Sequence, residues 1–248
     1  MSKATTPTSP DIASSKAIML QLFLQRVVAT WLGKLFVGGA AVLTSLRYAG
    51  GIYAFLEAEK LERPNYSVVQ RLTDGVEIRR YEPYLIAETT AEDAAGFQKA
   101  GKQTFRTLAG YIFGKNKARG GFLSSGKNEK MAMTAPVRLD GGQKKKTRVS
   151  FVIGSDYTLK TVPKPMEKKV TLRQVPAHTL AVKKFSGKPP SDERVQKQRE
   201  RLQSALKKAD IEVQNGDDTT LVYGYHDPFI TPNILRRNEV AVVIDGSV

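Results

Sequence analysis

The feature that most constrains this fold is a stretch of sequence that occurs twice. Residues 76–90 read VEIRRYEPYLIAETT, and residues 170–184 read VTLRQVPAHTLAVKK. At a shift of 94 positions without a gap, a valine, an arginine and an alanine coincide, and the helical patterns downstream align Leu108 with Leu202. Two copies are too few for a solenoid, which needs several short units. The repeat therefore predicts one domain built from two related halves.

Both halves have the same predicted order of elements, which is strand, strand, helix, strand, strand. An Asp-Gly turn signal separates the first two strands, and the apolar period then changes from that of a strand to that of a helix. The second helix begins after Ser191, a favourable N-cap, with acids in its first turn and lysines in its last. We expect strands over residues 66–72, 76–90, 130–139, 148–153, 170–185, 220–225 and 239–244, and helices over residues 94–113 and 191–209. The pattern predicts an α+β fold, a mostly antiparallel sheet of about eight strands with two helices outside, closed into a barrel or a deep saddle.

The N-terminal segment is predicted to lie outside that domain. Residues 18–56 are apolar and compatible with a helix, and three basic residues are their only charges. Three interpretations remain open for them: a membrane anchor or surface-lying helix, a cleaved transit or signal segment, or a helix packed on the domain or on a partner. Membrane association is the favoured localisation, with the cytoplasm or an organelle as the alternative. We predict an N-terminal segment over residues 1–58 and a domain over residues 59–248, with halves at residues 66–153 and 169–245.

Composition removes several classes of functional site. The 248 residues contain no cysteine, which excludes disulfides, thiolate metal sites and a cysteine nucleophile. Only His178 and His226 are present, so a metal site with several histidine ligands is disfavoured. The net charge of +15 favours anionic partners, although lysine clusters such as residues 144–146 are expected to be solvated surface. Because these clusters lack interleaved aromatic residues, we expect no nucleic-acid binding.

Several motifs share their order and spacing with one known family. They are VEIRRYEPYLIAETT, LAGYIFGKN (108–116), KMAMTAPV (130–137), YTLKTVPKP (157–165) and YGYHDPFITPNILRRNEV (223–240). On these motifs, residues 66–244 resemble the SOUL haem-binding protein family. The resemblance implies a pseudo-twofold-symmetric, distorted eight-stranded antiparallel β-barrel with two flanking helices, in agreement with the fold that the repeat predicts. It also implies non-covalent binding of haem b or a related tetrapyrrole in an apolar groove beside the first helix.

The resemblance also indicates candidate residues for that groove. Haem is a flat apolar disc with two carboxylates, so a site needs an apolar slot, cations and, optionally, an axial donor. The candidate contact residues are Phe105, Leu108, Ala109, Ile112, Met131, Met133, Arg106 and His226. His226 and His178 are weak candidates for an axial ligand, and the family includes haem binders without a strong axial bond. Each helix residue has an alternative interpretation as plain hydrophobic core.

Three functions compete. The leading hypothesis is a non-enzymatic haem or tetrapyrrole carrier or buffer, held at a membrane through residues 18–56. The second is a small-ligand sensing module, and the third is a weak hydrolase in which Glu239 or Glu88 acts as a general base. Catalysis is disfavoured because the sequence supplies no catalytic triad, metal site or phosphate loop. Glu239 lies in an otherwise apolar strand, where a buried carboxylate needs a cationic partner, and the candidates are Arg236, Arg237 and Arg79.

Overall fold

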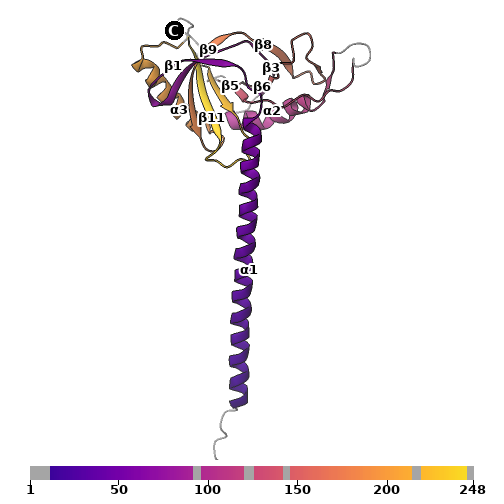
Figure 1. Cartoon of the computed structure of the whole chain (residues 1–248), viewed down its shortest axis with the longest axis vertical. Coiled ribbons are helices and arrows are strands. Elements are labelled where there is room, and N and C mark those ends of the chain that lie inside the picture. Colours follow the sequence, from indigo (N-terminus) through magenta and orange to yellow (C-terminus); the bar gives the residue numbers. More distant parts are fainter. Residues whose placement is uncertain (1–11, 92–95, 120–125, 142–145, 214–218, 245–248) are drawn as a thin grey trace, which may run out of the picture. The chain divides into compact units, whose positions relative to one another are not determined.

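The computed structural model describes residues 12–91, 96–119, 126–141, 146–213 and 219–244 (Figure 1). The chain forms two compact units, Met1–Ala49 and Gly50–Val248, and helix α1 (Ile12–Glu59) contributes residues to both. The domain boundary expected near residue 58 stays a prediction. The expectations for residues 1–11, 94–95, 144–145 and 245 lie outside the described residues.

Residues 18–56, for which a membrane anchor was one interpretation, form part of α1. Within the described part of the chain, none of the helices combines the length and the apolar character needed to cross a bilayer.

The unit Gly50–Val248 is built on one antiparallel sheet, which has nine strands in the described residues. The strands are β1 (Tyr66–Arg71), β2 (Val76–Tyr81), β3 (Tyr84–Ala91), β5 (Val137–Gly141), β6 (Thr147–Ile153), β8 (Thr171–Val175), β9 (His178–Ser186), β10 (Thr220–Gly224) and β11 (Arg237–Ile244). A second, short pair joins β4 (Asn116–Lys117) and β7 (Lys164–Pro165). The helices are α2 (Phe97–Ile112) and α3 (Asp192–Lys208), and a 3-10 turn, η1 (Thr73–Gly75), closes the β1–β2 hairpin at the predicted Asp-Gly signal.

The strand order shows the predicted pseudo-twofold symmetry. The order is β1-β2-β9-β11-β10-β5-β6-β3-β8, and its centre lies between β10 and β5. The first strand of each half therefore pairs with the second strand of the other half. The register agrees residue by residue, because Ile78 pairs with Ala181 and Ala87 pairs with Leu172, and a shift of 94 positions exchanges these two pairs.

Strand β1 lies outside this symmetry and accounts for the ninth strand. It adds to the edge of the sheet beside β2, while β8 forms the opposite edge. These two edge strands do not pair with each other, so the curled sheet forms an open half-barrel. The strand expected over residues 130–139 was wrong in its first part. Residues 130–136 bond to the end of α2 and to the segment before β1 instead, through Met131 N to Ile112 O and Ala135 N to Glu62 O.

Both helices cover the same face of the sheet. Helix α2 packs on β3 and β6, and α3 packs on β9 and β11. The predicted cap is present, since the Ser191 side chain accepts a hydrogen bond from Arg194 N at the start of α3. Because side chains alternate along a strand, β2 directs Val76 and Ile78 towards α3 and the next residue, Arg79, to the opposite face. That opposite face holds tyrosines and buried ions, and it contributes part of the site described next.

Candidate functional site

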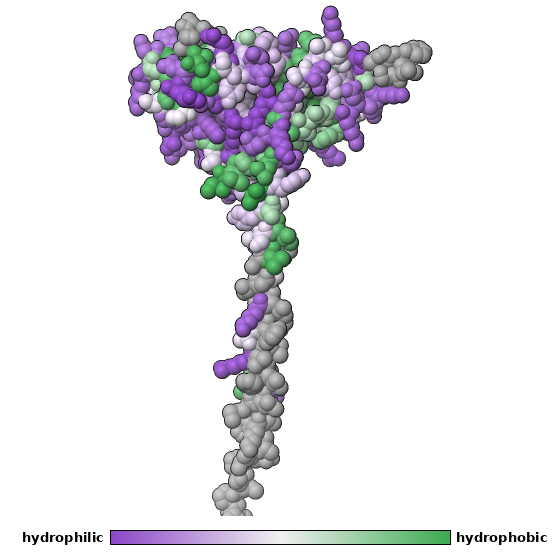
Figure 2. All heavy atoms as spheres, viewed as in Figure 1, coloured by the Kyte–Doolittle hydropathy of each residue, from purple (hydrophilic) through white to green (hydrophobic). Residues whose placement is uncertain are grey.

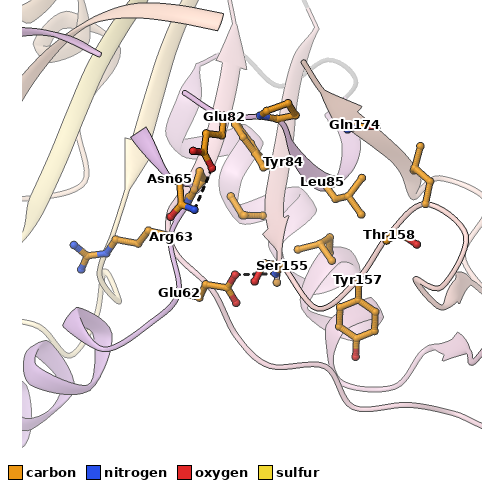
Figure 3. Close-up of a pocket in the computed structure, with 16 residues that line it drawn as sticks. Glu62, Arg63, Asn65, Glu82, Tyr84, Leu85, Ser155, Tyr157, Thr158 and Gln174 are labelled. Carbon is orange, nitrogen blue, oxygen red and sulfur yellow. Dashed lines mark hydrogen bonds between the residues drawn. The ribbon is translucent and has the colours of Figure 1, made fainter. Parts of the chain in front are cut away.

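A cavity of about 630 Å³ opens between described residues of the unit Gly50–Val248 (Figure 3). This volume lies within the roughly 300–1,000 Å³ typical of small-molecule sites. The cavity is bounded by residues 62–65, the turn between β2 and β3, and the connector that follows β6. Its lining consists of Glu62, Arg63, Pro64, Asn65, Glu82, Pro83, Tyr84, Leu85, Val152, Ile153, Gly154, Ser155, Tyr157, Thr158, Leu159 and Gln174.

Strand pairing places the apolar wall of the cavity. The start of β3 lies beside the end of β6 because the two strands are antiparallel, and Leu85 pairs with Ile153. On its other side Leu85 pairs with Gln174 of the edge strand β8. Leu159 from the connector completes the wall and is partly exposed to solvent. A flat apolar ligand would meet side chains from three strands and one loop here.

Hydrogen bonds fix the polar part of the lining (Figure 3). Glu62 Oε1 accepts from Ser155 N at 2.7 Å, and Asn65 Nδ2 donates to Glu82 Oε2 at 3.2 Å. Tyr157 donates its hydroxyl to Glu129 Oε1 at 2.7 Å. Burial, followed by this carboxylate, raises the pKa of Tyr157 to about 12, so its hydroxyl stays protonated. The first two bonds thus connect residues 62–65, which precede β1, to the connector after β6 and to the turn between β2 and β3.

Glu239 is the centre of a buried ion network on the helix-free face. Its side chain has no exposed surface, and both of its oxygens accept from Arg79 Nη1, at 3.0 and 3.1 Å. Arg237 donates twice to Oε1, at 3.0 and 2.7 Å, and the Tyr225 hydroxyl donates to Oε2 at 2.7 Å. Arg79 and Arg237, two of the three predicted cationic partners, therefore bind Glu239. The third, Arg236, donates to Thr231 O instead.

This network bears on the proposed general bases. A carboxylate offers about four lone-pair sites, and Glu239 receives five hydrogen bonds. Glu88 forms a two-pronged pair with Arg173, at 3.1 Å for each bond. Both carboxylates are held as ion-pair partners, and the lining of the cavity of Figure 3 contains neither residue.

Five of the residues predicted to contact haem lie together on and beside α2, where they form part of the hydrophobic core. Leu108, Ile112 and Met131 are buried in one cluster, and Ala109 and Met133 pack against it half-buried. Ligand contact by these residues stays a prediction.

Two predicted residues of α2 face solvent. Phe105 is 47% exposed and packs edge to face on Phe151, with ring centroids 5.3 Å apart. Arg106 is also exposed. Contact of either residue with a ligand stays a prediction as well.

The two histidines differ in how their ring nitrogens are engaged. His226 Nδ1 accepts from Arg237 N and its Nε2 bonds to Glu59 Oε1, both at 3.1 Å, while the ring stacks on Phe55. Burial lowers the pKa of His226 despite Glu59, so the ring is neutral with the proton on Nε2. His178 bonds through Nδ1 to Pro176 O, which leaves Nε2 without a hydrogen-bond partner among the described residues. Axial ligation by either histidine stays a prediction.

Sequence reasoning missed most of the cavity. Tyr84 and Leu85 lie in the repeated stretch, where a strand signal was visible, but nothing in the sequence showed that the connector after β6 would fold back against them. The structure also shows no cluster of three or more metal-ligating side chains within the described residues.

Comparison with known proteins gives one family and several distant structures. The family model described as SOUL heme-binding protein matches residues 61–243. No curated protein matches significantly.

Three solved structures show how remote the structural likeness is. A hydrolase from Listeria innocua is 9% identical, with 68% of this chain and 91% of that chain covered and a TM-score of 0.47. The EcmrR C-terminal domain is 10% identical, with 73% of this chain and 98% of that chain covered and a TM-score of 0.49. SAV2435 bound to tetraphenylphosphonium is 11% identical, with 73% of this chain and 94% of that chain covered and a TM-score of 0.38.

Proposed function

The chain belongs to the SOUL heme-binding protein family, and from this we propose that it binds haem or a related tetrapyrrole in the cavity of Figure 3. We further propose that it acts as a non-enzymatic carrier or buffer. The observation that carries the proposal is the position of the cavity, because every residue that lines it lies inside the matched range 61–243.

The lining fits a tetrapyrrole held by packing. Its volume and its apolar wall suit a flat disc, and its polar rim suits the edge of the ligand that faces solvent. The lining contains no histidine or methionine, and the Tyr157 hydroxyl is engaged by Glu129. A bound haem would supply a redox-active iron, whereas the protein would supply the shape of the site and exclusion of water. These features favour binding that does not depend on a strong axial bond.

The alternative functions have less support. A general base needs a free lone pair, and the hydrogen bonds to Glu239 leave it none. A sensor of hydrophobic cations needs open aromatic faces. Here Arg237 lies over the Tyr225 ring at 4.1 Å and Arg79 over the Tyr66 ring at 4.6 Å, so the protein's own cations take that position.

A haemin titration of the full chain tests the proposal. We expect a saturable Soret shift at one equivalent, and iron-free protoporphyrin IX should bind within about tenfold of haemin, because an axial bond is not required. Absence of a saturable shift would refute tetrapyrrole binding.

A cavity-filling variant tests the location of the site. Gln174→Trp places a large ring in the cavity from an exposed position of edge strand β8, where aromatic residues are well tolerated. Haemin affinity should fall at least about tenfold. The matched control is Gln70→Trp on the other edge strand, which is exposed and does not line the cavity. If Phe105→Asp abolishes binding and Gln174→Trp does not, the ligand lies on α2 instead.

Membrane association is a separate part of the proposal. Figure 2 shows mostly hydrophilic residues on the visible face of Gly50–Val248, with apolar side chains gathered in a few places. The loop between β10 and β11 exposes Phe229, Ile230 and Ile234, the last to 82%. Together with the net charge of +15, these residues favour contact with an anionic lipid surface. Full-length protein should co-float with anionic vesicles, and Phe229→Ser/Ile234→Ser should weaken this, whereas equal flotation of both proteins would remove the loop from the proposal.

A further inference from the structure

A second cluster of ions on the helix-free face carries one positive charge more than its partners neutralise. Arg138 on β5 donates through Nη2 to Asp140 Oδ2 at 3.3 Å, and Arg148 Nη2 donates to the same oxygen at 2.8 Å. Asp140 is thus shared between two guanidinium groups and lies closer to Arg148, which is half exposed and partly solvated. Arg138 is only 8% exposed and keeps the weaker contact. A buried charge without a full partner is unfavourable, so this site favours an anion.

The unused donors of Arg138 mark where that anion would bind. Neither Nε nor Nη1 of Arg138 has a hydrogen-bond partner, and the buried hydroxyl of Tyr223, its cross-strand neighbour, has none either. Burial raises the pKa of Tyr223 well above its ordinary value, so the hydroxyl is a permanent donor. Arg63 Nε is a further buried donor without a partner. Buried polar groups in native proteins are nearly always satisfied, and these four donor atoms each lack an acceptor.

These side chains line one small cavity. Its volume is about 10 Å³, which corresponds to about one water-sized oxygen. It shares four lining residues with the cavity of Figure 3, namely Arg63, Pro64, Tyr84 and Val152. The small cavity therefore adjoins the large one. A carboxylate on a ligand in the large cavity needs to place only one oxygen in the small cavity to meet the donors of Arg138 and Tyr223.

We propose that Arg138 and the Tyr223 hydroxyl form a buried oxyanion-recognition point, through which the large cavity selects flat apolar ligands that carry a carboxylate. This inference rests on the proposed tetrapyrrole function and names the group by which the ligand is recognised. It also separates the site from α2, whose exposed Arg106 was the cation expected from the sequence.

The first test compares protoporphyrin IX with its dimethyl ester, measured by quenching of protein fluorescence. The wild-type protein should bind the diacid more tightly. Arg138→Met should weaken diacid binding by about 10- to 100-fold and Tyr223→Phe by about 3- to 10-fold, with the ester unchanged, because hydrogen bonds to charged groups are worth this much. Arg173→Met is the matched control, since that arginine is paired with Glu88 and lines neither cavity.

Folding of the variants is controlled separately. Methionine keeps the apolar stem of Arg138, and phenylalanine removes a hydroxyl that has no partner, so neither change should lower the urea midpoint by much. If Arg138→Met fails to fold, Tyr223→Phe carries the test alone. Undiminished preference for the diacid in a folded variant would overturn the proposal and assign the empty space to a buried water.

A second pair of probes separates failure of this inference from failure of the proposed function. Anilinonaphthalene sulfonate and N-phenylnaphthylamine share an aromatic body, and only the first carries an oxyanion. If neither porphyrin binds the wild-type protein, the tetrapyrrole function is refuted, and this pair then decides on the oxyanion point. Tighter binding of the sulfonate that disappears in Arg138→Met supports the oxyanion point. Equal fluorescence titrations of both dyes, or no effect of the substitution, would refute it.

Discussion

Replacing Glu239 with glutamine should destabilise the protein strongly, because the buried Arg79 and the partly buried Arg237 lose this counter-charge. Arg79 is 3% exposed and Arg237 is 15% exposed, and both donate to this carboxylate at 3.1 Å or less. Breaking a buried pair by removing one partner costs roughly 3–5 kcal/mol. Glutamine keeps one acceptor oxygen, and Glu77 still contacts Arg79 at 2.7 Å, so we expect about 3 kcal/mol, the lower end of that range.

Urea unfolding followed by circular dichroism measures this loss. With a slope of about 2–3 kcal/mol per molar urea, the midpoint should fall by about 1–1.5 M. The matched control is Glu77→Gln, which removes a carboxylate from the same arginine at a position that is 26% exposed. Solvent screens that pair, so the control should lose about 1 kcal/mol or less.

The result also separates the structural role of Glu239 from catalysis. If Glu239→Gln unfolds within about 1 kcal/mol of the wild-type protein, the buried pairs are not needed, and the network reasoning fails. A base under selection for catalysis gives the opposite pattern, in which its removal abolishes turnover and leaves stability equal or higher.

Three further predictions concern pH, the core and a helix cap. Burial lowers the pKa of His226, so as the pH falls the unfolded chain takes up this proton before the folded chain does. The stability of the folded protein should therefore decrease as the pH drops below about 6.5. His226→Gln should reduce the decrease in Tm between about pH 7.5 and 5.5, and an equal decrease in both proteins would contradict this. Leu108→Ala should cost about 2–5 kcal/mol in urea unfolding, because the side chain is fully buried, and a loss below about 1 kcal/mol would show a loosely packed core. Ser191→Ala should cost about 0.5–1 kcal/mol by the same measurement, since it removes the hydrogen bond to Arg194 N, and no loss would mean that the cap is redundant.

The fold was predictable because register follows from a pattern with a period of two. Once Val76 and Ile78 are assigned to the helix side of a strand, the equivalent positions of the second copy are expected to face the same side, and the observed pairs of Ile78 with Ala181 and of Leu172 with Ala87 agree with this. The start of α3 was equally visible, because Ser191 and the acids after it satisfy the first turn. Residues that are close together in the sequence determine the facing of a strand and the start of a helix.

The site was far less predictable, because its parts are distant in the sequence and most have no periodic signal. Residues 62–65 precede the sheet, residues 154–159 form a connector, and Gln174 lies on an edge strand. They meet through long-range hydrogen bonds such as the one from Ser155 N to Glu62 Oε1, which no sequence motif predicts. Arg138 did carry a weak signal, since alternation with its neighbours on β5 places it on the face away from α2. The missing hydrogen-bond partners became visible only in the structure.

The two halves share a backbone plan but differ in charge, and this difference favours one ligand site over two. Arg79 and Arg173 occupy equivalent positions, yet their partners Glu239 and Glu88 do not, because the shift of 94 takes Glu88 to Val182. The ion pairs therefore do not follow the symmetry of the sheet. The group that retains an unmatched guanidinium, around Arg138, adjoins the large cavity at the ends of β3 and β6. If this cavity is the ligand site, as we propose, the symmetric sheet carries one such site, and the haemin titration should saturate at one equivalent.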